Sequence, residues 1–402
     1  MKVVVAQKDL KASLDIAQNT LGTNADISSH FVFEIQSETL VNVMSSESKR
    51  LYSCVPISPV KATGKGQFTI EGKRLIQAIN AIGDGHTINL EADEKGNVTL
   101  SREGNAKGKM NYPGLDPTTF PDWASEVSGA TLSKLLPAKL LSSCLTAIKP
   151  YVSDDDTKRP ELCQAVIKDG KMMATDAYSL AILRSAEFEG LDFKIQLKDF
   201  PNVLKFLKAH ETQDVEVFST GKAHILKAQD GTTLGFMRSQ HNFQNLPPHF
   251  LNSFDWTPRR VWAFNKGELL QAIDLLSSGA DKNDLFVTFN HEENALTNPS
   301  LTMDSLTERD SLVEEVAQIT VVEADASEYP LKMVIDNQKA EKTTPDISSF
   351  KFNYKYLKEV VAGLDEQVVF GCSKEGTKGF MLFKDKFSDF NIDMVSIVAW
   401  VS

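Results

Sequence analysis

The stretch Phe68-Thr69-Ile70-Glu71-Gly72-Lys73 carries a pattern that the chain repeats twice more. The other copies read Phe193-Lys194-Ile195-Gln196-Leu197-Lys198 and Phe350-Lys351-Phe352-Asn353-Tyr354-Lys355. Each begins with Phe, has Ile or Phe two residues later and ends in Lys. The first half of each copy alternates as a strand does, and the apolar residues that follow are spaced as in a helix. We therefore expect one strand–helix unit to occur three times.

A second strand–helix unit precedes each copy. Segments between the units, such as 31–35 and 98–100, alternate apolar and polar residues, which favours antiparallel sheets with one buried face. Two helices are therefore expected in each repeat, over residues 7–21, 72–83, 137–149, 197–209, 265–276 and 353–364. The competing interpretation is a chance agreement of three loose patterns, which the common position of the helices disfavours.

These patterns predict an α+β fold made of three repeated domains, each with two helices packed on antiparallel sheets. A chain of 402 residues is long enough for several cores. We expect boundaries near residues 127 and 256, which give domains 1–127, 128–256 and 257–402. Within the third domain, the segment 291–349 is rich in Glu, Asp, Thr and Asn and is interpreted as elaborated strands and loops.

Composition narrows the class of protein. No run of eighteen apolar residues occurs, so no membrane span is expected. The apolar run at Val3 to Val5 ends within a few residues at Lys8, so no signal peptide is expected and the protein should stay in the cytoplasm. The four cysteines form no C-x-x-C pair and are interpreted as ordinary thiols of a reducing compartment.

The distribution of charge matters more than its sum. The formal net charge is −11, which alone argues against binding phosphates. The expected helices nevertheless carry more basic than acidic residues, and in residues 72–83 an apolar stripe opposes Lys73. For any one helix, the basic residues are explained equally well as lysines that are simply exposed to solvent. Taken together, eleven residues are candidates to face a phosphate backbone: Lys8, Lys11, Lys73, Arg74, Lys139, Lys149, Lys198, Lys205, Lys208, Lys355 and Lys358.

Four short motifs lie in order along the chain: Phe120-Pro121, Arg159-Pro160-Glu161-Leu162, Ala174-Thr175-Asp176-Ala177-Tyr178-Ser179-Leu180-Ala181 and Phe352-Asn353-Tyr354-Lys355-Tyr356-Leu357. They resemble the Phe-Pro, Arg-x-x-Leu, Ala-Thr-Asp-Gly-His-Arg-Leu-Ala and Phe-Asn-x-x-Tyr-Leu motifs of the bacterial sliding clamp family, the beta subunit of DNA polymerase III. Singly the matches are weak, but together, on a three-repeat chain, they are fairly specific.

The resemblance implies a head-to-tail homodimer, a closed ring of six similar domains with helices lining the hole and sheets outside. Such a ring would encircle duplex DNA without sequence preference and tether a DNA polymerase. An ATP-driven clamp loader would open it, and both partners would bind through short peptide motifs. The setting would be the cytoplasm of a bacterial cell, or of a phage-infected host for a divergent member.

The resemblance also places two sites by position. The partner-peptide pocket would use Arg159, Leu162, Thr175, Tyr178, Leu180 and Trp400. The dimer contact would bring Met110 and Tyr112, on an expected edge strand, against Leu275 and Leu276. The alternative for Leu162 and Leu180 is that they are core residues. Because Ala177-Tyr178-Ser179 stands where the family has Gly-His-Arg, a different peptide preference is expected.

Catalytic motifs are absent from the sequence. It contains no G-x-x-x-x-G-K-[ST], no G-x-S-x-G and no H-E-x-x-H. The run Asp154-Asp155-Asp156 is interpreted as a solvated loop rather than a magnesium site. We therefore expect no enzyme activity, no cofactor and no metal. Two alternatives remain: a β-rich structural or adaptor protein without a DNA role, and an enzyme with a dispersed site around Asp176, Tyr178 and Arg159.

Overall fold

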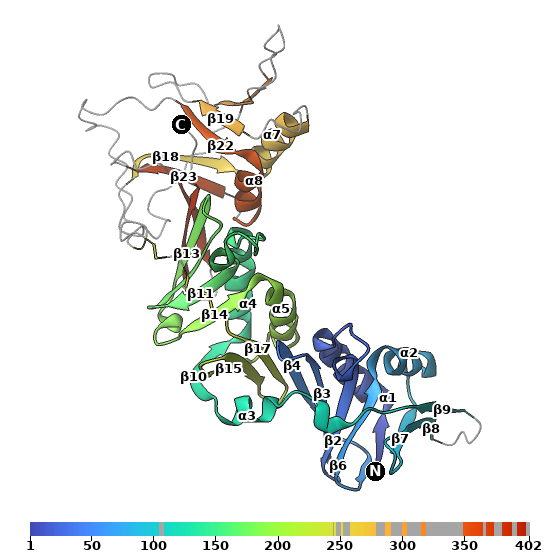
Figure 1. The fold of residues 1–402 in the computed structure, drawn as a ribbon. Coiled ribbons are helices and arrows are strands. Elements are labelled where there is room, and N and C mark those ends of the chain that lie inside the picture. The colour runs from blue at the N-terminus through green and yellow to red at the C-terminus, as the bar shows by residue number, and fades with distance from the viewer. Residues whose placement is uncertain are drawn as a thin grey trace. The chain divides into compact units, whose positions relative to one another are not determined.

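The structure, a computed structural model, describes residues 1–103, 108–243, 245–246, 251, 258–278, 286–290, 300–303, 315–318, 349–364, 367–373, 380–387 and 392–398, with only the backbone for many of the later strands. Figure 1 follows the described elements from blue at the N-terminus to red at the C-terminus. The contacts within the chain divide it into two compact units. One comprises Met1–Ser142, Asp192–Lys194 and Lys198–Gln240, and the other comprises Ser143–Leu191, Ile195–Leu197 and His241–Ser402.

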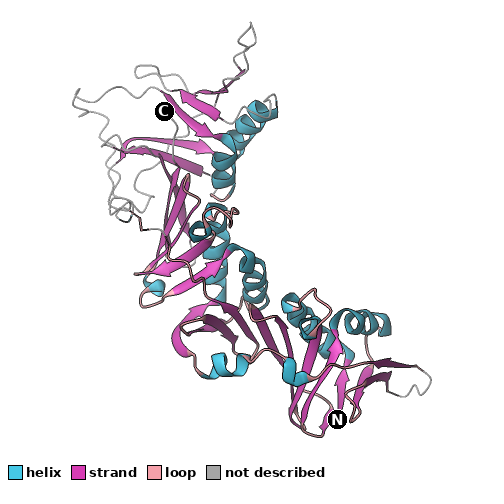
Figure 2. Ribbon diagram, viewed as in Figure 1, coloured by secondary structure: helices cyan, strands magenta, loops and turns pink. Residues whose placement is uncertain are grey.

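All six predicted helices are present, each directly after a strand or one short turn beyond it (Figure 2). Three of them are shorter than predicted: residues 18–20 and 149–151 form 3-10 turns after the first and third helices, and residues 197–199 form one before the fourth. The pairs are β1 (Lys2–Ala6) with α1 (Gln7–Ala17), β6 (Gly66–Glu71) with α2 (Gly72–Ile82), β10 (Thr131–Pro137) with α4 (Ala138–Ile148), β14 (Phe193–Gln196) with α5 (Phe200–Ala209), β18 (Pro258–Asn265) with α7 (Lys266–Ser278), and β22 (Ser349–Asn353) with α8 (Tyr354–Ala362).

Amphipathic patterning explains these helices. In α2, Leu75 and Ile79 are buried, whereas Lys73 and Gln77 are exposed, as a helix with one apolar stripe requires. The side chain of Asn353 caps α8 by accepting a hydrogen bond from the Lys355 backbone N–H. Within the described residues, no helix is long and apolar enough to cross a membrane.

The first two sheets are built mainly from the N-terminal half of the chain. A five-stranded sheet has the order β5-β1-β7-β8-β9, and an eight-stranded sheet has the order β10-β15-β16-β17-β4-β3-β2-β6. Their further strands are β2 (His30–Ser37), β3 (Leu40–Glu47), β4 (Leu51–Ile57), β5 (Lys61–Thr63), β7 (Thr87–Ala92), β8 (Val98–Arg102), β9 (Lys109–Tyr112), β15 (Asp214–Ser219), β16 (Ala223–Ala228) and β17 (Thr233–Met237).

Two more sheets follow. A second eight-stranded sheet has the order β14-β11-β12-β13-β25-β24-β23-β18, and a four-stranded sheet has the order β21-β20-β19-β22. Their further strands are β11 (Gln164–Lys168), β12 (Lys171–Thr175), β13 (Ser179–Arg184), β19 (Phe286–Asn290), β20 (Ser300–Met303), β21 (Glu315–Gln318), β23 (Gln367–Ser373), β24 (Phe380–Phe387) and β25 (Ile392–Val398). Strands β20 and β21 lie in the segment 291–349.

The strand pairing itself repeats three times, and it is antiparallel, as predicted. The strand before the first helix of each repeat pairs with the strand after the second helix: β1 with β7, β10 with β15 and β18 with β23. Each repeat therefore has a first strand group, β2-β3-β4, β11-β12-β13 or β19-β20-β21, and a second, β7-β8-β9, β15-β16-β17 or β23-β24-β25.

Successive repeats are joined edge to edge. Strand β4 of the first repeat pairs with β17 of the second, and β13 of the second pairs with β25 of the third. Each eight-stranded sheet therefore takes its strands from two repeats. This sharing explains why the two compact units cut across the domain boundaries expected near residues 127 and 256.

A buried tryptophan covers the β4–β17 joint. Trp123 opens the short helix α3 (Trp123–Ser128), is 3% exposed, and donates from Nε1 to Ser46 Oγ at 3.1 Å. Its ring stacks on Tyr52 with centroids 5.4 Å apart. Opposite Tyr52 in the strand register stands Gly235, where a Cβ would lie 2.9 Å from the indole. Glycine is therefore required there by close packing rather than by backbone conformation.

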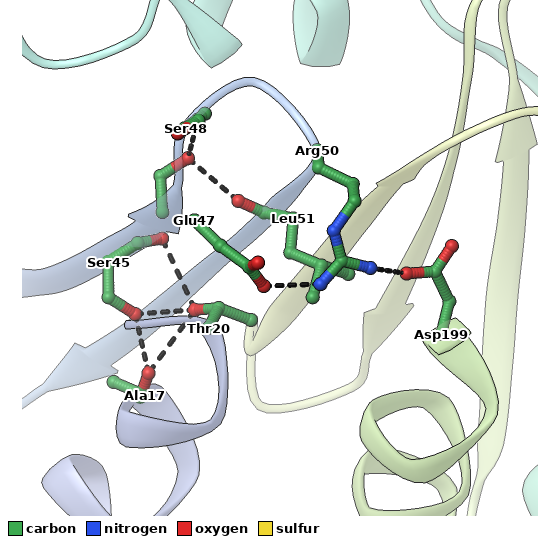
Figure 3. A network of polar contacts seen from close by, with 9 residues as sticks. Ala17, Thr20, Ser45, Glu47, Ser48, Arg50, Leu51 and Asp199 are labelled. Atoms are coloured by element: carbon green, nitrogen blue, oxygen red, sulfur yellow. Dashed lines mark hydrogen bonds and ion pairs between the residues drawn. The ribbon is translucent and has the colours of Figure 1, made fainter. Parts of the chain in front are cut away.

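A network of polar contacts lies near the same joint (Figure 3). Arg50, in the β3–β4 turn, forms ion pairs with Glu47 and with Asp199 at the start of α5, 149 residues away. Burial raises the pKa of Asp199 to about 6, against the opposing effect of Arg50. Nearby, the hydroxyl groups of Thr20 and Ser45 are 2.6 Å apart.

We expect Gly235→Ala to lower the free energy of unfolding by about 1–3 kcal/mol, because the added methyl group would overpack a rigid indole. Urea unfolding followed by tryptophan fluorescence measures the change. The matched control is Gly221→Ala, where a Cβ would meet nothing within 4 Å; it should shift stability by less than about 0.5 kcal/mol. Equal effects from the two substitutions would contradict the packing argument.

Candidate nucleic-acid and partner-binding surfaces

The basic residues singled out from the sequence lie on the solvent side of the helices and of their flanking turns. Ten of the eleven are exposed, and Lys11 is half-buried. Lys149 and Lys198 lie on 3-10 turns rather than on α-helices. In α5 the buried residues Val203 and Leu207 alternate with exposed Lys205 and Lys208, so this helix presents its cations to solvent.

Part of this positive charge is neutralised locally, which counting residues along the sequence did not reveal. Arg74 Nε lies 3.0 Å from the carboxylate of Glu71, and Lys358 pairs with Asp274 of α7. Lys205 keeps its charge, because the side-chain oxygen of Asn19 to which it donates at 2.8 Å is neutral. The exposed ion pairs are weak and are screened by salt, so they do not hold Arg74 and Lys358 in fixed positions.

The turn between β12 and β13 is built by its own side chains. Thr175 Oγ1 donates to the Ser179 carbonyl at 2.6 Å, and Asp176 Oδ1 accepts from the backbone N–H groups of Tyr178 and Ser179 at 2.8 and 2.6 Å. An Asp in this role forms an Asx turn. Burial raises the pKa of Asp176, although these hydrogen bonds act in the opposite direction.

The middle residue of this turn, Ala177, has a φ of 80°. Residues with a side chain rarely adopt a positive φ, whereas glycine adopts it without strain. The position is the one at which the resembling family has glycine. The turn therefore has the backbone conformation that glycine favours, and Ala177 adopts it with some backbone strain.

Tyr178 projects from this turn and stacks on Tyr356 of α8, with ring centroids 5.0 Å apart and an angle of 17° between the planes. Tyr178 is 57% exposed. Sequence analysis selected Tyr178 but missed Tyr356, although Tyr356 is part of the Phe-Asn-x-x-Tyr-Leu motif. The turn and the first turn of α8 together form an exposed aromatic surface.

The remaining pocket candidates differ in accessibility. Leu162, Thr175 and Leu180 are buried, at 1%, 5% and 5% exposure, which agrees with the alternative that the two leucines are core residues. Arg159 is exposed, and its Nε lies 3.3 Å from Glu161. Trp400 lies outside the described residues. Within the part of the chain that the structure describes, no group of three His, Cys, Asp or Glu side chains is arranged to hold a metal.

Known structures share this architecture over their whole length. The DNA polymerase III subunit beta from Pseudomonas aeruginosa superposes with a TM-score of 0.77 at 12% identity, with 100% of each chain covered. The beta subunit from Streptococcus pyogenes gives 0.76 at 17%, and the Helicobacter pylori beta clamp gives 0.72 at 17%, each with 100% of both chains covered. This chain has the sliding-clamp fold. Its sequence matches no family model and no curated protein.

In this clamp fold the candidate dimer residues are unevenly placed. As expected, β9 is the outer strand of its sheet among the strands that the structure describes. Met110 is 39% exposed, whereas Tyr112 is 6% exposed and belongs to the core of the first repeat. Leu275 is 64% exposed, and the side chain of Leu276 lies outside the described residues. Met110 and Leu275 therefore offer the accessible apolar surface.

We expect Ala177→Gly to raise the free energy of unfolding by about 0.5–1 kcal/mol, because glycine relieves the positive φ. Thermal or urea unfolding measures the change. Ala130→Gly, at a residue without positive φ, should leave stability unchanged or lower it slightly. A loss of stability from Ala177→Gly would show that the turn is not strained.

Proposed function

We propose that this protein is a non-catalytic DNA sliding clamp and processivity factor. In this proposal two chains of three domains, 1–127, 128–256 and 257–402, form a closed ring around duplex DNA. The ring tethers a DNA polymerase and is opened by an ATP-driven clamp loader in the cytoplasm. Full-length similarity of fold to DNA polymerase III beta subunits supports a clamp function over the alternative of an adaptor without a DNA role.

The observation that carries the proposal is the repeated edge-to-edge joint. The last strand of the first group in one repeat pairs with the last strand of the second group in the next, as β4 pairs with β17 and β13 with β25. By the same rule, β21 of the third repeat and β9 of the first are the two strands left over. Both are outer strands of their described sheets.

Pairing β21 of one chain with β9 of another would complete the pattern. It would also cover two edges whose unpaired N–H and C=O groups otherwise favour aggregation. Two such contacts, related by a twofold axis, close a ring of six repeats. Met110 on β9 and Leu275 on α7 are the exposed apolar side chains that we place at this contact, together with Tyr112 and Leu276.

The basic helix surfaces supply the contact with DNA in this proposal. Lys and Arg side chains on several helices can contact phosphates of either strand, and such contacts do not depend on sequence. Retention on DNA then comes from the closed ring, so individual contacts can be weak. The eleven basic residues named above are the proposed lining.

The exposed surface around the β12–β13 turn supports the proposed partner-peptide pocket. Thr175, Leu162 and Leu180 would form its floor, and Arg159 and Tyr178 its rim. Tyr356 joins this set because its ring stacks on Tyr178. Trp400 stays in the proposal by its position in the sequence.

Met110→Arg should convert the dimer into monomers, because it places a charge at the proposed strand contact. Light scattering should give twice 44.5 kDa for the unaltered protein and 44.5 kDa for the variant. The Kd of the dimer should rise about tenfold or more, which corresponds to a loss of roughly 1.4 kcal/mol of association free energy. Val60→Arg is the control, since Val60 is 70% exposed in a loop. An unaltered protein of 44.5 kDa at high concentration would exclude the dimer.

Replacing Lys73, Arg74, Lys205 and Lys208 together by Ala should weaken duplex DNA binding and flatten its salt dependence. Each phosphate contact contributes about 0.9 to the slope of log K against log salt, so we expect the slope to fall by about 2 or more. Titration of fluorescent duplex DNA over a salt series measures it. The control replaces four exposed lysines outside the helices, Lys65, Lys95, Lys168 and Lys222; equal losses in both variants would contradict a helix lining.

A further inference from the structure

The Tyr178–Tyr356 stack leaves an aromatic face in solvent. Tyr178 is 57% exposed, and its ring packs nearly parallel to that of Tyr356 at 5.0 Å. The two rings come from the β12–β13 turn and from the first turn of α8, which lie in the same compact unit. Exposed aromatic surface that is fixed in place favours binding, because little conformational freedom is lost when a ligand covers it.

Three carboxylates add negative charge near Tyr356. Burial raises the pKa of Tyr356, and the negative charges of Asp176, Asp154 and Glu359 raise it further. Glu359 lies one helical turn after Tyr356 and therefore on the same flank of α8. Asp154 and Glu359 are both exposed, and neither forms an ion pair with another described residue.

The neighbouring cations are engaged elsewhere. Arg159 lies 3.3 Å from Glu161, Lys158 lies 3.6 Å from Asp155, and Lys358 pairs with Asp274. Lys355 sits 6.0 Å from the ring centre of Tyr354. The ion pairs of Arg159, Lys158 and Lys358 given above are with other carboxylates, so Asp154 and Glu359 add negative charge beside the aromatic pair.

We propose that Tyr178 and Tyr356, with Asp154 and Glu359, form a subsite for a cationic side chain, Arg or Lys, of a partner peptide. The negative face of an aromatic ring attracts a cation, and a guanidinium can in addition lie flat on the ring. The nearby carboxylates strengthen this attraction and repel an acidic peptide. The inference rests on the proposed partner-binding surface and specifies the chemistry of the residue it prefers.

The probe is a displayed library of random peptides, selected on the full-length protein. We expect the peptides that bind to be enriched in Arg or Lys beside an apolar residue. For a selected peptide, replacing its Arg by Leu should raise the Kd about five- to tenfold, by the combined loss of the ring contact and the ionic attraction. The preference should weaken in high salt.

Variants then assign the preference to this site. Asp154→Asn with Glu359→Gln should reduce the Arg-over-Leu ratio to about twofold, and Tyr178→Leu should reduce it similarly, whereas Tyr178→Phe should retain it. The control for charge is Asp169→Asn with Glu187→Gln, two exposed acids elsewhere in the same unit, which should leave the ratio unchanged.

The outcomes separate this inference from the proposed function. Peptides whose binding depends on Tyr178 but which show no cationic preference would overturn the subsite and leave the pocket in place. A library that yields no peptide dependent on Tyr178 would overturn both the subsite and the pocket. The ring and its DNA contact are tested independently by the mass and salt measurements.

Discussion

The pairing of edge strands is the constraint on which the rest of this structure depends. Four short strands make a sheet with two open edges, and open edges are unfavourable for a soluble protein. Here the outermost strands β4 and β13 are covered by strands of the following repeat. The β4–β17 joint depends on three further contacts. Trp123 packs over it, Gly235 leaves space for the indole, and Arg50 links the β3–β4 turn to Asp199.

Local patterns were sufficient to predict the repeat, the six helices and the edge position of β9, because periodicity and alternation are read within a few residues. Contacts between distant residues could not be predicted. Arg50 and Asp199 are 149 residues apart, and no local pattern in a single sequence links them. Tyr356 was missed for the same reason, since its stack on Tyr178 exists only once a turn of one repeat meets a helix of the next. The burial of Tyr112 could not be predicted either. Alternation indicates that one face of a strand is buried, but it does not show which residues stay accessible to a partner.

The helix α8 illustrates how one element can serve two surfaces. Successive residues of a helix are about 100° apart, so Lys355 and Tyr356 project in different directions although they are adjacent in sequence. Lys358 is exposed and, being two residues after Tyr356, lies about 160° from it around the helix. One helix can therefore present a basic residue and an aromatic ring on different sides, and a net charge of −11 does not exclude a locally basic surface.

A joint made by strand pairing does not require a peptide bond between the repeats that it connects. The hydrogen-bond ladder between β4 and β17 is the same whether the two strands belong to one polypeptide or to two. Covalent connectivity and strand pairing are therefore separable in this fold. In the proposed ring, a circularly permuted chain, opened at the boundary between two repeats and closed across its original termini by a suitable linker, would retain every joint while moving the subunit boundary to a different place.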